Sequence, residues 1–327
     1  MASANQLLCI VVPCYNEAEM IGLFYQTIKP VLNGLPNLDH QIIFVDDGSN
    51  DGSLKLLNQL AQHDSGVRVY ALSRNFGHQI ALTAGLDTVQ GDAVIMMDLD
   101  LQHPPALIPE MTGLWRQGND IVSAIRTHTA DATWLKRVAS DGFYRLINLL
   151  SDTQIISGAA DFCLLSRPAY EALRQFPERH RFLRGLVSWI GFQRAFVQYK
   201  APPRAAGHTK YTLGEMFKLA VNATLSFSGT PVRLAVRFGF ATIFISLLYL
   251  VYIVICLFTN KELVPGWTSI IFLTTFLGGV QLAFIGLLGE YIARIFEEVK
   301  RRPLYVLKQR PPPAGPDAPS SAAQPLK

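Results

Sequence analysis

The chain has 327 residues, of which 50% are hydrophobic and 17% are charged, with a formal net charge of +4. A charged fraction below the usual quarter indicates that part of the chain contacts a membrane, and the length suits one large domain with a smaller addition. The positive excess does not indicate nucleic-acid binding, because the basic residues collect beside apolar segments near the C-terminus, where anionic lipid headgroups account for them.

The N-terminal part of the chain carries no targeting signal and no disulfide pattern. Its first apolar run, Leu7–Val12, stops at Pro13 and is too short for a signal sequence. The four cysteines form no C-x-x-C pair and have no histidine at zinc spacing. We therefore expect reduced thiols and an N-terminal domain in the cytoplasm.

Short apolar runs alternate with helical patterns over the first 125 residues. The spacing of Leu54, Leu57 and Leu60 is helical, and the apolar runs predict five buried strands: Leu7–Val12, Gln41–Asp46, Val67–Ala71, Ala93–Met97 and Asp120–Ala124. This alternation predicts an α/β domain with a mostly parallel sheet flanked by helices. Ligands on such sheets bind at the carboxyl ends of the strands.

Polar side chains follow four of these predicted strands. In the segment Met97–Gln102, alternation places Asp98 and Asp100 on the same side of the chain, so both carboxylates can face one site. Oxygen ligands of this kind suit Mg²⁺ or Mn²⁺. One acidic strand end is often only a solvated turn, but repeated polar ends at VVPCYNE, FVDDGSNDGS and SRNFGH indicate a ligand site. His78, His103 and His208 lie near these motifs, and we predict no catalytic role for them.

Two uncharged segments near the C-terminus, at about 238–258 and 268–289, are each long enough to cross a bilayer. Basic residues precede the first segment and follow the second. This pattern predicts a two-helix transmembrane hairpin in the inner (plasma) membrane, with both of its ends on the cytoplasmic side. Two buried helices of a globular core are the alternative. Three glycines of the second segment favour close helix approach and a homo-oligomer: Gly278, Gly279 and Gly286.

The predicted organisation has five parts. A cytoplasmic domain covers residues 1–211, a juxtamembrane amphipathic helix 212–232, the two membrane helices 233–290, a basic cytoplasmic segment 291–310 and a disordered tail 311–327. The juxtamembrane helix lies either on the membrane surface or against the domain.

In combination, these motifs resemble the family-2 glycosyltransferases of GT-A fold. From Leu7 to Tyr305 the chain resembles the polyisoprenyl-phosphate glycosyltransferases, such as bactoprenol glucosyltransferases and dolichyl-phosphate mannose synthases. Further matching segments are MDLDLQHPP, SGAADFCLLSR, RFLRG and AGHTKYTLGEM. The resemblance implies inverting, metal-dependent transfer of a hexose, foremost glucose from UDP-glucose, to undecaprenyl or dolichyl phosphate.

The resemblance also implies residue roles. Nucleotide-sugar ligands would be Pro13, Tyr15, Glu17, Asp46, Asp47, Asp98 and Gln102. Asp98, Asp100 and Gln102 would hold Mg²⁺ or Mn²⁺. Asp161 would be a base or an orienting group, acting with Asp100. Phosphate and acceptor ligands would be Arg126, Arg137, Arg181, Arg184, Arg204 and Lys210.

Two other functions remain open. A processive polysaccharide synthase shares the N-terminal motifs, but it usually has more spans and a Q-x-x-R-W signature, whereas residues 181–185 read RFLRG. A non-catalytic membrane scaffold with a nucleotide-sugar-binding domain is expected to have lost the acidic strand ends, and Asp46, Asp98 and Asp100 are all present.

Overall fold

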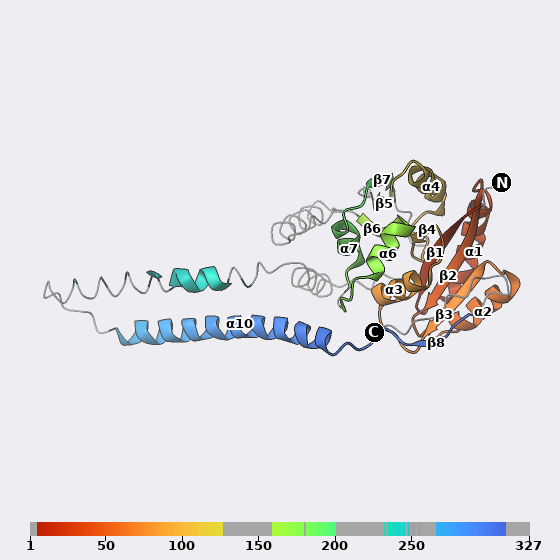
Figure 1. Cartoon of the computed structure of the whole chain (residues 1–327). Coiled ribbons are helices and arrows are strands. Elements are labelled where there is room, and N and C mark those ends of the chain that lie inside the picture. Colours follow the sequence, from red (N-terminus) through yellow and green to blue (C-terminus); the bar gives the residue numbers. More distant parts are fainter. Residues whose placement is uncertain are drawn as a thin grey trace.

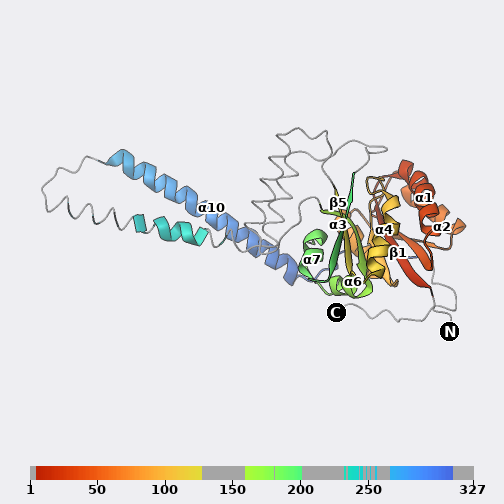
Figure 2. The same ribbon diagram turned by 90° about the horizontal axis from the view of Figure 1, so that it is seen from above.

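A computed structural model describes residues 5–126, 159–179, 181–200 and 266–311, together with 232, 235–242, 244, 245, 248, 251 and 255. These residues form an α/β domain and a long helix that extends away from it (Figures 1 and 2). Arg137, Arg204, Lys210 and His208 lie outside the described residues. So do nearly all of the predicted juxtamembrane helix, much of the first predicted span and nearly all of the tail.

An eight-stranded mixed sheet, ordered β7-β5-β6-β4-β1-β2-β3-β8, forms the centre of the domain. Its strands are β1 (Gln6–Cys14), β2 (Leu38–Asp46), β3 (Val67–Leu72), β4 (Ala93–Met96), β5 (Ile121–Arg126), β6 (Ala159–Ser166), β7 (Arg194–Tyr199) and β8 (Leu307–Gln309). The pairs β1–β2, β1–β4, β2–β3 and β5–β7 are parallel, whereas β6 and β8 pair antiparallel with their neighbours. The mostly parallel sheet and its five predicted strands are confirmed.

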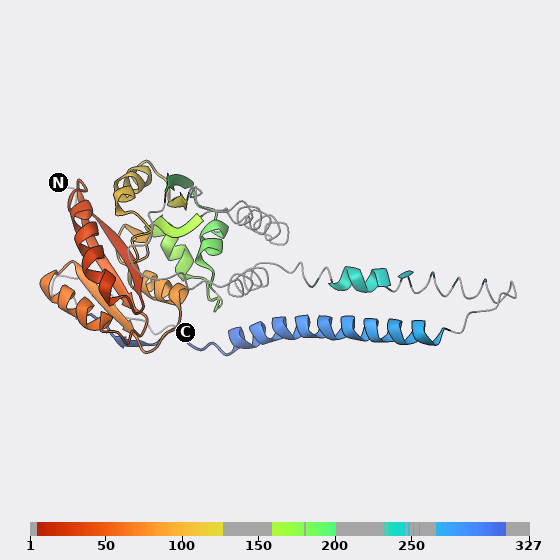
Figure 3. The same cartoon turned by 180° about the vertical axis from the view of Figure 1, so that it is seen from behind.

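Helices cover both faces of the sheet, which explains why the central strands are continuous apolar runs. One core cluster lies under α1 (Ala18–Asn33), α2 (Ser53–His63) and α4 (Ile108–Arg116), the last preceded by the 3₁₀ turn η1 (Pro105–Leu107). The opposite cluster lies under α3 (His78–Thr88), α6 (Arg167–Arg174) and α7 (Leu183–Trp189). Figure 3 shows α1 and α2 lying over the N-terminal half of the sheet.

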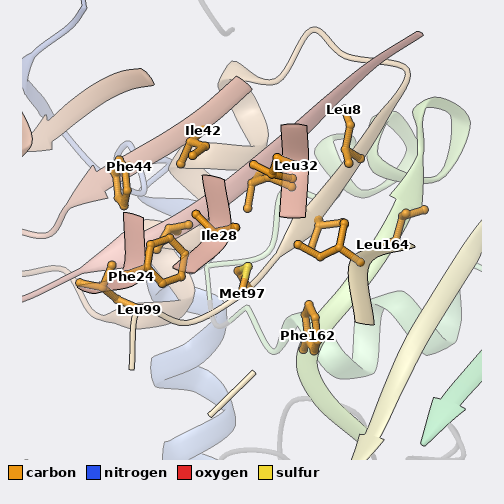
Figure 4. Packing of buried hydrophobic residues seen from close by; sticks show 14 of the residues in the cluster. Leu8, Phe24, Ile28, Leu32, Ile42, Phe44, Met97, Leu99, Phe162 and Leu164 are labelled. Carbon is orange, nitrogen blue, oxygen red and sulfur yellow. The ribbon is translucent and has the colours of Figure 1, made fainter. Parts of the chain in front are cut away.

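The first cluster contains large side chains with no exposed surface. Phe24 of α1 meets Phe44 of β2 edge to face, with ring centroids 6.0 Å apart. Ile28 and Leu32 continue the same side of α1 at helical spacing, and Figure 4 shows them beside Ile42. This packing fixes α1 on one face of the sheet, and it therefore also fixes the loop that precedes α1 at the carboxyl end of β1.

Helix α3 packs unusually close to the sheet. A Cβ atom on Gly85 would lie 2.3 Å from Cγ1 of Val11 and 3.2 Å from Cγ2 of Val45, so the helix approaches β1 and β2 more closely than any side chain would permit. The consequence is that the first residues of α3 reach the carboxyl ends of these strands.

The C-terminal helix α10 (Trp267–Val299) has 33 residues and is therefore roughly 50 Å long. Among the described residues it is the one helix long and apolar enough to cross a membrane, over Phe276–Val299. The second predicted span is thus a helix, and it continues past the predicted end at 289. At the start of the first predicted span, residues 235–242 are described and helical, with the Phe238 ring 5.9 Å from that of Phe284 in α10, and this part does not amount to the full hairpin.

After α10 the chain returns to the domain, which the sequence patterns did not predict. β8 adds to the edge of the sheet beside β3, and the Tyr305 hydroxyl donates a hydrogen bond to Asp87 Oδ2 at 2.9 Å. The backbone N–H of Arg179 donates to Glu298 Oε1 of α10 at 2.8 Å. The long helix is therefore attached to the domain at its base, through Arg179, and again through the segment that follows it.

The close approach of α3 gives a stability prediction. Gly85→Ala should destabilise the protein by about 1–3 kcal/mol, because the new methyl group overlaps Val11. Gly113→Ala in α4 is the matched control, since a Cβ there would meet nothing within 4 Å; it should be neutral or stabilising by up to about 1 kcal/mol. Thermal unfolding in detergent measures both. Equal effects of the two substitutions would contradict the close packing of α3.

Candidate functional site

One edge of the sheet gathers the acidic side chains. The parallel strands β1, β2 and β4 all end there, and β6, which runs the opposite way, begins there. Met96 pairs with Cys163, and continuing this register by two residues places Asp98 opposite Asp161. Asp98, the predicted nucleotide-sugar and metal ligand, and Asp161, the predicted base or orienting group, therefore lie on neighbouring strand ends.

The loop after β1 is held by the loop after β2. The backbone N–H of Asn16, which has a φ of 53°, donates to Ser49 Oγ at 3.0 Å. The N–H of Ala18, in the first turn of α1, donates to Asp51 Oδ2 at 3.0 Å. Part of the FVDDGSNDGS motif thus supplies the N-terminal cap of α1 from another loop, and it fixes the predicted nucleoside-binding loop.

Asp46 and Asp47 are both buried but are used differently. Asp47 accepts the backbone N–H groups of Phe76 and Gly77, at 2.7 and 2.9 Å, and so holds the loop that leads into α3. Asp46 accepts the N–H of Ser49 through Oδ2 at 3.2 Å, while its buried Oδ1 has no hydrogen-bond partner within the described part of the chain. Burial raises the pKa of Asp46. Asp46 therefore has an oxygen available for a ligand, whereas Asp47 has a supporting role.

Two histidines hold Asp98. Nε2 of His78 lies 2.7 Å from Asp98 Oδ1, and the backbone N–H of Asp98 donates to Nδ1 of His103 at 3.0 Å. Burial would raise the pKa of Asp98, but the hydrogen bond with His78, together with the neighbouring charges of His103 and Arg184, outweighs burial and holds that pKa well below its usual range. His103 is buried and stacks on Phe162, with ring centroids 5.1 Å apart. Both histidines are therefore positioning residues, a role that the sequence analysis did not predict.

The turn after Asp98 is strained. Leu101 has a φ of 58°, a conformation that a leucine rarely adopts, and its side chain packs against the first core cluster. The N–H of Gln102 donates to Asp100 Oδ1 at 3.0 Å. The turn thus keeps Asp98, Asp100 and Gln102 within five consecutive residues at the carboxyl end of β4.

These side chains suit a divalent cation that shares its ligands with a substrate. Two carboxylates and an amide oxygen are hard donors of the kind that Mg²⁺ and Mn²⁺ bind. Within the described residues, no group of three or more His, Cys, Asp or Glu side chains could hold a metal ion alone. Mg²⁺ is commonly bound through one or two carboxylates together with phosphate oxygens of a substrate.

Asp161 is engaged by a guanidinium group. Nε and Nη2 of Arg184 donate to its two carboxylate oxygens at 2.7 and 2.9 Å, and Nε2 of Gln79 donates to Oδ2 at 3.3 Å. Asp161 is 6% exposed, whereas the Arg184 side chain is 36% exposed. The buried carboxylate therefore holds a cation whose outer face reaches solvent.

Other predicted residues lie at the ends of two strands, β1 and β5. Tyr15 is exposed and Glu17 half-buried in the loop after β1, while Pro13 is buried within that strand. Arg126 is exposed at the end of β5, paired in register with Tyr199.

Arg181 does not join the acidic side chains in the described structure. Its guanidinium donates to the backbone carbonyls of Glu178 and Phe176, and it interacts with Asp87 near the far end of α3. Burial lowers the pKa of Arg181. Its predicted phosphate-binding role stays untested.

The protein-family model described as glycosyl transferase family 2 matches residues 9–174 of the chain. The chain is 39% identical over 302 residues to a bactoprenol glucosyl transferase of Shigella phage SfII, covering 92% of this chain and 97% of that protein. A prophage bactoprenol glucosyl transferase homolog of Escherichia coli K12 is 36% identical, covering 92% and 98%. The glycosyltransferase YkcC of Bacillus subtilis is 39% identical, covering 92% and 93%.

A solved mannosyl-3-phosphoglycerate synthase of Rubrobacter xylanophilus is a more distant likeness, with a TM-score of 0.46 and 19% identity over 72% of this chain and 75% of that chain. The assignment of the chain to a family rests on the family model and on the sequence relatives, which are glycosyltransferases. The chain belongs to glycosyltransferase family 2.

The burial of Asp46 predicts an unusual effect on stability. Asp46→Asn should raise the Tm of the ligand-free protein at neutral pH, because it removes a charge that burial disfavours. Because the pKa of Asp46 is higher in the folded state than in the unfolded state, the wild-type protein becomes less stable as the pH rises from the pKa of the unfolded state to that of the folded state. The gap between variant and wild type should therefore widen with pH over that range and then level off.

Asp64 provides the control with the opposite sign. Despite burial, hydrogen bonds from Lys29 and Tyr25 lower the pKa of Asp64 to about 2, so its stabilising contribution is present at neutral pH and is lost as pH falls towards that value. Asp64→Asn should cost about 1.5–3 kcal/mol at pH 7. Thermal unfolding from pH 3 to 8 compares the two variants, and a lower Tm for Asp46→Asn at pH 7 would contradict this account of Asp46.

Proposed function

We propose that this family-2 enzyme transfers a hexose from a nucleotide-sugar to a polyisoprenyl phosphate, giving a lipid-linked phosphosugar. UDP-glucose and undecaprenyl phosphate are the proposed substrates, because relatives that match over 92% of the chain are bactoprenol glucosyl transferases. The observation that carries the proposal is the meeting of the Asp98 and Asp161–Arg184 groups at one sheet edge, in a chain with a membrane-length helix.

On the donor side, Asp46 is the proposed ligand for the nucleoside. Its buried Oδ1 can accept a hydrogen bond from an N–H group of the base, which would satisfy an oxygen that has no partner in the described residues. Pro13, Tyr15 and Glu17 would line the same part of the site, with Asp47 supporting the neighbouring loop. A diphosphate would then extend towards Asp98.

Asp98, Asp100 and Gln102 would hold Mg²⁺ or Mn²⁺ together with diphosphate oxygens. When bound, the cation neutralises charge on the departing nucleoside diphosphate. The chain's own contribution is to keep Asp98 ionised and oriented, which His78 and the low pKa of Asp98 support.

On the acceptor side, the chemistry requires a cation more than a strong base. A phosphate monoester is largely dianionic at pH 7 and already nucleophilic. Its oxygen would form a bond to the anomeric carbon while the bond from that carbon to the diphosphate oxygen breaks, with inversion of configuration. Arg184 and Arg126 are the described candidates to bind this phosphate, with Arg137, Arg181, Arg204 and Lys210 as further candidates. The ion pair with Arg184 favours orientation over proton removal as the role of Asp161.

The membrane arrangement follows from the acceptor, which stays in the bilayer. We propose a helix hairpin with the domain and both termini in the cytoplasm. α10 is roughly 50 Å long against a hydrocarbon core of about 30 Å, so its last turns would project towards the domain. Thiol labelling of Asn260→Cys and Lys308→Cys in intact cells, with the native cysteines replaced, tests this. The first should react from outside and the second only after permeabilisation; the reverse would contradict the arrangement.

The direct test is transfer of radiolabelled sugar to undecaprenyl phosphate in detergent, from a panel of nucleotide-sugars. Label from UDP-glucose should enter the lipid, EDTA should stop it, and Asp100→Ala should reduce turnover by at least about 10²-fold, since electrostatic groups of this kind contribute that much. Asp39→Ala, an exposed carboxylate on β2 away from this edge, is the control. Failure of every donor with folded protein would favour the scaffold alternative, and long polysaccharide products would favour the synthase.

A further inference from the structure

Gln79, the second residue of α3, links two elements of the site. Its Nε2 donates to Asp161 Oδ2 at 3.3 Å, and its Oε1 accepts the backbone N–H of Leu183 at 3.0 Å. Leu183 is the first residue of α7. Phe182, which precedes it, has no side-chain oxygen to accept the first N–H groups of the helix, so Gln79 provides that acceptor from another element.

These contacts close a ring of interactions around Arg184. Arg184 follows Leu183 directly in α7, and its guanidinium binds both carboxylate oxygens of Asp161. One amide side chain therefore holds both ends of the ion pair: the carboxylate through its N–H and the helix that carries the guanidinium through its oxygen. Amide groups can do this because they combine a donor and an acceptor.

The same end of α3 also holds the donor side. His78, the residue before Gln79, is bonded to Asp98. The dipeptide therefore contacts both carboxylates that face each other across β4 and β6, and the close packing of α3 at Gly85 keeps it there. Any displacement of α3 would move both groups together.

We propose that Gln79 is a positioning residue that sets the place of Arg184 for the acceptor phosphate. The proposal rests on the transfer reaction proposed above. It predicts that Gln79 affects the binding of the acceptor phosphate and not the binding of the donor nucleotide-sugar. A residue with a merely structural role would instead change the Tm and all kinetic constants together.

Gln79→Glu separates the two contacts. The glutamate keeps an oxygen for the N–H of Leu183, but it loses the donor to Asp161 and places a second carboxylate beside it. The KM for undecaprenyl phosphate should rise about tenfold, the effect of one lost hydrogen bond to a charged group, while the KM for UDP-glucose stays within twofold. Gln90→Glu, the same change at an exposed position after α3, should alter neither constant.

A double-mutant cycle tests whether Gln79 acts through Arg184, and it remains informative if the Gln79→Glu variant does not fold. Gln79→Ala should raise the acceptor KM in the wild-type background but have little further effect when Arg184 is already alanine, because the two residues act through one interaction. Additive effects, or equal changes in the donor and acceptor KM, would overturn the proposal. If the wild type transfers no sugar to the lipid, the proposed function fails instead, so the two failures are distinguishable.

Discussion

The site depends on holding several carboxylates together at one edge of a sheet, where burial and mutual repulsion both disfavour their charges. The fold compensates each one separately. Asp47 receives two backbone N–H groups, Asp98 receives a histidine, and Asp161 receives a guanidinium. Asp46 is the exception, because one of its buried oxygens has no partner among the residues that the structure describes. A side chain left incomplete in this way suits a ligand that brings its own donor.

Helix α3 transmits this arrangement through the domain. Its N-terminal turn touches the carboxylates of two strands, its middle packs on β1 at Gly85, and its last turn receives Tyr305 from the C-terminal segment. The segment that carries Tyr305 follows α10 and adds β8 to the sheet. The apolar helix and the acidic site are thus connected through the packing of one short helix.

Much of this could be predicted from the sequence, because apolar runs and polar strand ends report burial and sheet direction. The five N-terminal strands and the position of Asp98 just after a buried strand follow from these patterns, whereas β4 ends at Met96, so strand alternation does not extend to Asp98 and Asp100. β8 could not be predicted, since three residues of an edge strand have no distinctive pattern. Nor could the roles of His78, Gln79 and His103: a single polar side chain shows no partner until the fold brings Asp98 and Asp161 beside it. The contacts of Arg181 could not be predicted either, because its motif gives no sign that its guanidinium group binds backbone carbonyl groups and interacts with Asp87 at the far end of α3.

The central claim is that the acceptor is a lipid phosphate whose own oxygen attacks the anomeric carbon of the donor sugar. The most direct measurement compares undecaprenyl phosphate with undecaprenol as acceptors for the same labelled donor, with chromatographic analysis of the lipid product. The account predicts label in a phosphate-linked lipid and none in undecaprenol, because a hydroxyl has no charge for Arg184 to bind and needs a base that Asp161 does not provide in its ion pair. Equal transfer to undecaprenol would contradict it.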